Sequence, residues 1–187
     1  MAPTIVEGDY LFVNKLAYDL KLPFTNIRLL TWANPRRGDV VTFFSPVNGL
    51  RLVKRVVAAP GDVIEMRGDR LYLNGVAAEY TRVDEAAAWD MDAAVRQGNL
   101  FAMEREPGAG QSHPVAMAPS SASHSFGPKI IPAGKYFMMG DNRDNSFDSR
   151  YFGLVDHKQI VGHGIAVAAS FGSYGLPRWR RFLTAFN

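Results

Sequence analysis

The chain has 187 residues, of which 47% are hydrophobic and 21% charged, close to the average for a folded globular protein. This excludes a largely disordered chain, and the length suffices for one domain with a large insertion. The formal charge of +3 suits an anionic membrane surface, but no long basic cluster predicts a nucleic-acid partner. The absence of cysteine excludes disulfides and thiolate nucleophiles. No apolar run reaches the ~18–20 residues that span a bilayer, so we expect this chain to be soluble.

Short β-type runs bounded by turn residues recur along the chain and predict a mainly β fold. Asn74-Gly75 follows one of these runs and predicts a type I′ hairpin, because both central residues of that turn must accept a positive φ. The runs cover residues 10–13, 39–44, 51–58, 63–66, 70–73, 135–139 and 160–168.

The composition changes after about residue 80. Residues 83–97 are rich in alanine, which predicts a short helix. Residues 107–128 are rich in Gly, Ser, Ala, His and Pro, which predicts a flexible loop, and strand-like sequence resumes at Lys129. We therefore expect a β core formed by residues 1–66 and 129–187. The intervening 67–128 would be an insertion with a β-hairpin, a short helix and a loop.

The C-terminal segment, residues 176–186, mixes aromatic residues with three arginines. It could be a solvated tail that packs its apolar side chains on the core. It could also be an interfacial anchor, with Trp179 and Phe182 among lipid headgroups and the arginines on phosphates.

Lys54 lies in an apolar run, residues 50–59, that contains only two other basic residues. Alternation along a strand places it between Leu52 and Val56 on one face. Burial disfavours the ammonium form and lowers the pKa of a lysine, and a neutral amine can take a proton from a hydroxyl group. The alternative is a lysine whose stem runs along the sheet while its amine stays in water.

Residues 139–153 are dense in Asp, Asn, Arg and Ser, and such a loop can hold its shape by side-chain hydrogen bonds to its own backbone. One alternative is a purely structural loop. Another is a calcium loop that uses Asp141, Asp144 and Asp148, although the EF-hand spacing is absent.

Two serines in this loop, Ser146 and Ser149, are candidate nucleophiles. We prefer a supporting role for Ser146, whose hydroxyl would position the Lys54 amine. Arg143 with Asp144 or Asp148 would form an ion pair inside the loop.

These segments resemble the signature motifs of type I signal peptidases, the serine/lysine-dyad membrane enzymes (bacterial leader peptidases) that remove signal peptides from exported proteins. The resemblance covers residues 1–66 and 129–165 and implies a core of coiled antiparallel sheets with an inserted smaller domain or hairpin. The motifs are Pro3-Thr4 with Gly8-Asp9, Arg37-Gly38-Asp39, Lys54-Arg55 with Pro60-Gly61-Asp62, and Gly140-Asp141-Asn142-Arg143-Asp144-Asn145-Ser146 with Asp148-Ser149-Arg150.

The resemblance implies that Lys54 is the general base and that Ser146 hydrogen-bonds and positions it. Asp148 would organise the loop through Arg150 or Arg143. The family's nucleophilic serine directly precedes its Met-x-Pro-Thr motif, and the sequence printed here starts at that Met, so we expect this chain to be inactive as given. Ala2 cannot substitute. In some members a second serine, two positions earlier, helps form the oxyanion hole. We expect this serine and the family's transmembrane anchor to lie outside the chain as well.

Substrates of this family have small residues one and three positions before the cut. By resemblance Met1, Ile5, Leu52 and Val53 would line shallow apolar pockets, and the signal-peptide region would bind as an extended strand along residues 50–53. The resemblance implies a bacterial inner-membrane enzyme whose catalytic domain faces the periplasm and meets the bilayer surface. It needs no cofactor and no metal. The four histidines lie outside the motifs and are expected to be structural or surface residues.

Three alternatives stay open. A pilus-maturation or conjugation peptidase would share the serine/lysine chemistry with a narrower substrate range. A self-cleaving repressor would need a DNA-binding helix-turn-helix and a cleavage site in cis, neither of which is visible. A non-catalytic peptidase-like binding module is the third.

Overall fold

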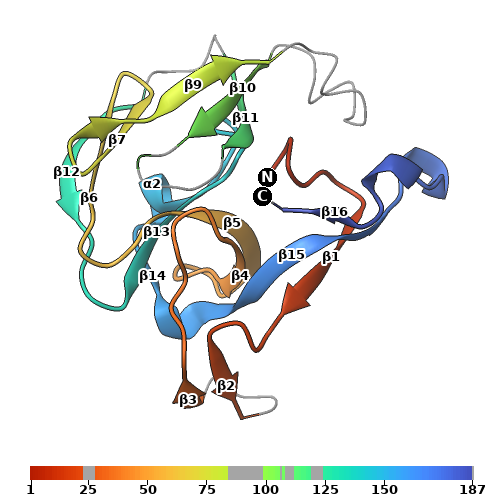
Figure 1. The fold of residues 1–187 in the computed structure, drawn as a ribbon, viewed down its shortest axis with the longest axis horizontal. Coiled ribbons are helices and arrows are strands. Elements are labelled where there is room, and N and C mark those ends of the chain that lie inside the picture. Colours follow the sequence, from red (N-terminus) through yellow and green to blue (C-terminus); the bar gives the residue numbers. More distant parts are fainter. Residues whose placement is uncertain (23–27, 84–98, 106, 108–111, 119–123, 187) are drawn as a thin grey trace.

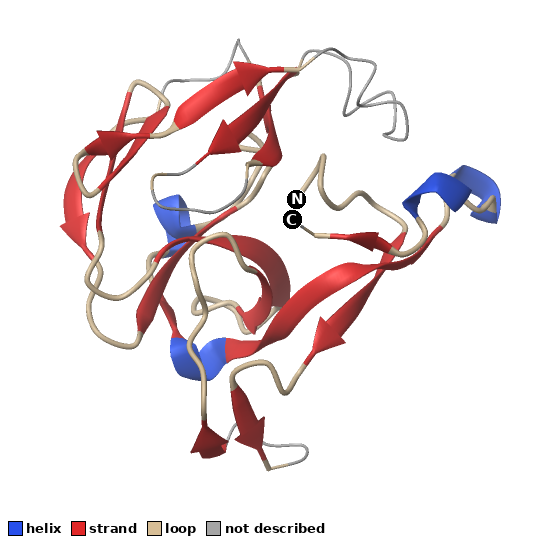
Figure 2. Cartoon of the chain, viewed as in Figure 1, coloured by secondary structure: helices blue, strands red, loops and turns tan. Residues whose placement is uncertain are grey.

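The computed structural model of the chain describes residues 1–22, 28–83, 99–105, 107, 112–118 and 124–186. Strands dominate these residues, and helices are few and short (Figure 2). None of the helices in the described residues is long and apolar enough to cross a membrane. The predicted mainly β fold is therefore confirmed.

The largest sheet has the strand order β1-β15-β4-β5-β13-β14, with β16 also paired to β15 (Figure 1). Both ends of the chain contribute, since the first strand pairs antiparallel with the long strand near the C-terminus. The strands of this sheet are β1 (Asp9–Asn14), β4 (Val40–Phe44), β5 (Arg51–Ala58), β13 (Lys135–Met139), β14 (Val155–Asp156), β15 (Ile160–Ser170) and β16 (Thr184–Ala185).

Three smaller sheets complete the fold, with the orders β12-β6-β7-β8, β11-β10-β9 and β2-β3. All ladder pairings between these strands are antiparallel. Their strands are β2 (Asp19–Lys21), β3 (Arg28–Thr31), β6 (Val63–Arg67), β7 (Arg70–Leu73), β8 (Val76–Ala77), β9 (Glu79–Arg82), β10 (Leu100–Arg105), β11 (His113–Met117) and β12 (Phe126–Ile130). The helical elements are α2 (Ser149–Phe152), η2 (His157–Gln159), η3 (Ser173–Gly175) and η4 (Trp179–Arg181).

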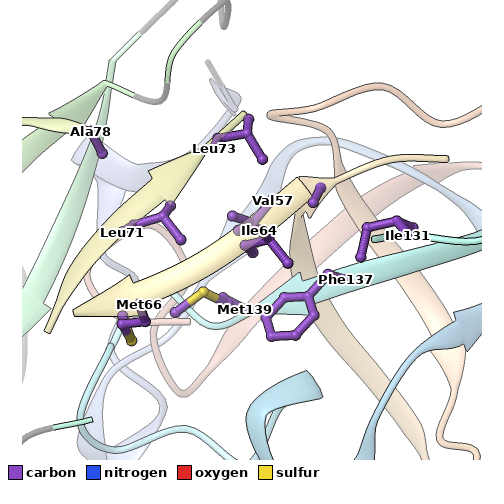
Figure 3. Packing of buried hydrophobic residues seen from close by; sticks show 10 residues of the cluster. Val57, Ile64, Met66, Leu71, Leu73, Ala78, Ile131, Phe137 and Met139 are labelled. Carbon is purple, nitrogen blue, oxygen red and sulfur yellow. The ribbon is translucent and has the colours of Figure 1, made fainter. Parts of the chain in front are cut away.

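Two apolar clusters cover opposite faces of β5. Val57 belongs to the cluster that joins the large sheet to β6 and β7, where Ile64, Leu71 and Phe137 pack together (Figure 3). Val56 belongs to the other cluster. The alternation predicted for residues 51–58 is therefore confirmed, and burial on both faces makes β5 a rigid support for the side chains that it carries.

All seven predicted strand runs are present, at β1, β4, β5, β6, β7, β13 and β15. The predicted turn after β7 is also confirmed, because Asn74 and Gly75 have φ angles of 53° and 81°.

The predicted loop at 107–128 is wrong in part, because it contains β11 and the first residues of β12. The strand β11 was not predicted because it contains Pro114. A proline is tolerated there because β11 is an edge strand of its sheet. Strand structure resumes at Phe126, not at Lys129. The helix predicted at 83–97 lies almost entirely outside the described residues, and the division into core and insertion stays a prediction.

Candidate active site

Lys54 of β5 and Ser146 of the loop after β13 meet in the candidate site. Lys54 lies on β5 with 9% of its surface exposed, and its Nζ donates a hydrogen bond to Ser146 Oγ over 2.7 Å. The surface alternative for this lysine is therefore wrong, because the amine is held inside the protein. The pairing predicted between these two side chains is present.

The pKa of Lys54 is lowered, and burial is the largest cause because it disfavours the ammonium form. Asp148 opposes this shift, since its negative charge favours the ammonium, whereas Arg150 acts in the same direction as burial. The site therefore contains an amine that loses its proton more readily than an ordinary lysine.

Asp148 organises the loop that carries Ser146. It is the N-cap of α2, its Oδ2 accepts a hydrogen bond from Gly140 N at 3.1 Å, and Arg150 Nε donates to its Oδ1 at 2.9 Å. Burial alone would raise the pKa of Asp148, but the hydrogen bonds and charge of Arg150 lower it. The partner of Asp148 is thus Arg150, one of the two that the sequence left open.

Because Gly140 has no side chain, Lys54 and Ser146 have room to approach each other beside it. A Cβ atom at this position would lie 2.2 Å from Ser146 Oγ and 3.2 Å from Lys54 Nζ. Its φ is not in the left-handed region, so glycine is required here by the close approach of these two side chains.

Asp141 connects the loop to β5 and to the N-terminal segment. Arg55 forms a two-pronged ion pair with it, at 3.0 Å from Nε to Oδ1 and 2.9 Å from Nη2 to Oδ2, and Thr4 donates its hydroxyl hydrogen to the same carboxylate. Burial by itself would raise the pKa of Asp141, but Arg55, with His113 and Thr4, lowers it to about 2. Asp141 is therefore ionised at neutral pH and fixes three segments to one another.

The loop also adds to the edge of the sheet that contains β11. Ala116 N donates to Asp141 O at 2.9 Å, and Arg143 N donates to Ala116 O at 2.8 Å. Arg143 Nη1 donates to Glu104 Oε1 at 3.0 Å, so Arg143 forms an ion pair with a residue of β10, outside its own loop. The prediction that Arg143 pairs with Asp144 or Asp148 inside the loop is therefore corrected to a pair with Glu104.

The calcium-loop alternative is not supported by this geometry. The carboxylates of Asp141 and Asp148 are each engaged by an arginine, Arg55 and Arg150 respectively. Two of the three proposed ligands are therefore already occupied by protein cations.

The sequence of this chain matches that of a known protein family. The family model described as "Signal peptidase, peptidase S26" matches residues 1–169. The chain belongs to this signal peptidase family. A signal peptidase I of Pseudomonas fluorescens is 37% identical over 91% of this chain and 62% of its own length. Signal peptidase I T of Bacillus subtilis is 32% identical over 87% of this chain and 65% of its own.

A solved structure of a signal peptidase I from Enterococcus faecalis is 31% identical, covers 70% of this chain and 97% of that chain, and has a TM-score of 0.40. The chain spans 62% of the length of the Pseudomonas signal peptidases that it matches.

The N-terminal segment of this signal peptidase chain lies against the lysine. The Met1 nitrogen is buried, and its pKa as an amine is lowered by burial and then by the charge of Lys54. Ala2 packs in a small apolar cluster with Phe101 and Ala116, and Arg181 Nη2 donates to Thr4 O at 3.0 Å. Residues from both ends of the chain thus hold the segment in place.

The four predicted pocket residues, Met1, Ile5, Leu52 and Val53, are all half-buried. Leu52 packs against the apolar cluster of Val56, and Val53 pairs with Thr42 of β4. On the other side, β13 pairs with β5 only from Arg55 onward, so residues 51–53 have one edge without a strand partner among the described residues.

Sequence reasoning gave Glu104 no role and treated Asp141 only as a possible calcium ligand. Glu104 is fully buried and also accepts a hydrogen bond from Tyr80 Oη at 2.9 Å. Burial and the charge of Glu104 raise the pKa of Tyr80 well above its usual range. No local pattern singles out Glu104, which follows Met103 and precedes the charged Arg105, and its partner Arg143 is 39 residues away.

Proposed function

We propose that this chain is the catalytic part of a membrane-bound endopeptidase that removes signal peptides from exported preproteins by a serine/lysine dyad. The observation that carries the proposal is the buried Lys54 amine, whose pKa is lowered and whose position is set by Ser146. The family supports the peptidase activity, and the amine supplies a base that works without histidine.

In this proposal the nucleophile is a serine bonded to the Met1 nitrogen. The influence of Lys54 on the pKa of the Met1 amine supports the placement, because that influence requires the two nitrogens to be near each other. A residue attached there would extend from the surroundings of Lys54. The hydrogen bonds of Thr4 and the packing of Ala2 would keep its backbone fixed during the reaction.

The proposed reaction begins with neutral Lys54. The serine Oγ attacks the scissile carbonyl carbon while Nζ takes the hydroxyl proton, and the oxyanion forms next to the serine's own backbone N–H. Collapse of this intermediate breaks the C–N bond, and the Lys54 ammonium gives its proton to the leaving amine. Lys54 then takes a proton from the water that attacks the acyl carbon, and as the ester C–O bond breaks the ammonium returns this proton to the serine Oγ.

The preprotein would bind as an extended strand. One edge of residues 51–53, just before Lys54, has no strand partner in the part of the chain that the structure describes. Apolar surface beside it comes from Met1, Ile5, Leu52 and Val53. Backbone hydrogen bonds along this edge would hold the substrate in register, and shallow pockets would admit only small side chains.

We also propose that the protein works at the outer face of a bacterial inner membrane. An exposed aromatic group supports contact with lipid: Tyr10 packs on Phe171, Phe171 on Phe182, and Phe182 on Trp179, which is 72% exposed. The exposed Arg180 lies in the same turn as Trp179. Aromatic and arginine side chains together suit the headgroup region, which favours the anchor interpretation of residues 176–186.

The test of the catalytic proposal uses the chain extended by a serine before Met1 and a signal-peptide substrate. We expect cleavage by the extended chain and none by its Lys54→Met variant, which keeps the length of the side chain. The matched control is Lys158→Met, at an exposed lysine, which should cleave normally. Cleavage by a folded Lys54→Met variant would refute the assignment of the base.

A further inference from the structure

A cluster of three side chains lies outside the lysine site: Asp69, His124 and Asp144. They come from the turn between β6 and β7, from the segment just before β12, and from the loop that carries Ser146. Their nearest ligand atoms all lie within 4.8 Å of one another. No sequence spacing relates these three residues, and the family resemblance implied no metal.

We propose that these three residues bind a divalent transition-metal ion, with zinc as the best fit, in a site that fastens the Ser146 loop to the neighbouring sheet. His124 Nδ1 lies 3.4 Å from Asp69 Oδ1 and 3.7 Å from Asp144 Oδ1. With zinc–ligand bonds of about 2.0–2.2 Å, two ligand atoms in a tetrahedron are about 3.4 Å apart. The two distances from His124 Nδ1 are therefore close to those between zinc ligands, and the two carboxylate oxygens lie within 4.8 Å of each other.

The second observation is the state of the His124 ring. Nδ1 is buried from solvent and makes no hydrogen bond within the described residues, although two carboxylates flank it. Nε2 is 2.9 Å from Tyr151 Oη and can donate a hydrogen to it. In that tautomer Nδ1 carries a lone pair and no hydrogen. A lone pair facing two carboxylates is unfavourable, and either a cation between them or a hydrogen on Nδ1 relieves it, which titration with zinc distinguishes.

The surrounding contacts fix the ligands as a metal site requires. Asp144 has 9% of its side chain exposed, and its Oδ2 accepts a hydrogen bond from Ala118 N at 2.7 Å, which leaves Oδ1 toward His124. Asp69 N donates to His124 O at 3.0 Å. Such outer contacts orient the ligands before the metal arrives.

The charge balance also favours a dication. Two aspartates and a neutral histidine carry a charge of about −2. Arg143 and Arg150 line the adjacent cavity of about 170 Å³, but each already has an acidic partner, Glu104 and Asp148 respectively. Asp69 and Asp144 line the same cavity, which gives the ion a route from solvent and room for a water as a fourth ligand.

Zinc suits this donor set better than calcium or magnesium. An imidazole nitrogen suits zinc and other transition metals, and zinc also accepts carboxylate oxygens, whereas calcium takes six to eight oxygens and magnesium keeps an octahedral shell. Because neither Lys54 nor the proposed nucleophile belongs to the set, the ion would position the loop and take no part in the reaction.

The test is calorimetric titration of the untagged 187-residue chain with zinc chloride at neutral pH. We expect one zinc per chain, and at least about tenfold weaker binding in His124→Gln. The matched control is His163→Gln, because His163 faces a single carboxylate, with Nε2 3.9 Å from Asp39 Oδ1, and its loss should leave zinc binding unchanged.

A second variant protects the test against misfolding. Asp69 has 41% of its side chain exposed, so Asp69→Asn should fold, and zinc should raise the Tm of the parent chain but not of this variant. Absence of saturable zinc binding by the parent, or equal binding by His124→Gln, would overturn the proposal. The cluster would then be an ion pair around a protonated histidine.

Discussion

The Lys54 amine and the Ser146 hydroxyl lie 2.7 Å apart although 92 residues separate them in the chain. Lys54 is supplied by a strand buried on both faces, and Ser146 by a loop that is pinned by Asp148 and Asp141. The pair is therefore preorganised by two independent parts of the fold, and changes in either part should affect the same amine.

Replacing Gly140 with alanine should damage the site directly. The added Cβ would lie 2.2 Å from Ser146 Oγ, so the serine must move away from Lys54, with a stability loss of about 1–3 kcal/mol from overpacking. Cleavage by the serine-extended chain should fall by about 10²-fold, as for a displaced catalytic group. The matched control is Gly127→Ala, where nothing lies within 4 Å of the added atom. Equal activity of the two variants would contradict this explanation of Gly140.

The charges around Lys54 should move its pKa in opposite directions. Asp148 raises the pKa of Lys54 and Arg150 lowers it. In Asp148→Asn the acid limb of the pH–rate profile should therefore shift to lower pH, and in Arg150→Gln to higher pH. Circular dichroism must confirm that both variants fold. Shifts in the same direction would show that the variants act through disruption of the loop and not through charge.

The ion pair between Arg143 and Glu104 should contribute to holding the fold together. Both side chains are buried, with 5% and 0% exposed, so Glu104→Gln removes a buried negative charge from beside the Arg143 guanidinium. We expect a loss of about 3–5 kcal/mol in the free energy of unfolding, measured with urea. Glu65→Gln removes the partner of Arg67, whose side chain is 64% exposed, and should cost no more than about 1 kcal/mol. Equal losses in the two variants would contradict a structural role for the buried pair.

Asp141 should make the fold sensitive to acid. Its pKa is lowered from 3.8 to about 2, so its contribution is fully present above pH 3.8 and is lost as the pH falls through about 2. The shift corresponds to about 2 kcal/mol. The free energy of unfolding should therefore fall less steeply over this pH range in Asp141→Asn than in the parent. Parallel curves would show that Asp141 contributes nothing to the pH dependence.

The fold was predictable where apolar runs were continuous and bounded by turns. The run around Lys54 fits a strand buried on both faces, and Asn74-Gly75 fits one turn geometry. The strand at 113–117 was missed because proline and histidine in a Gly- and Ser-rich region resemble a loop. Its place on an edge depends on pairing with β10, which local sequence does not encode.

The site was predictable to the extent that its residues form continuous motifs. Lys54, Ser146 and Asp148 stand in such motifs, and the resemblance supplied their roles. Glu104 and His124 do not, because their partners lie far away in sequence and meet them only after the sheets have packed. Their contacts follow from tertiary structure alone.

The central claim is that neutral Lys54 is the base, and the pH–rate profile of the serine-extended chain tests it most directly. Because burial lowers the pKa of Lys54 from 10.5, kcat/KM should rise with pH in proportion to the neutral amine and level off below pH 10.5. A profile that stays flat from neutral to alkaline pH would contradict the account.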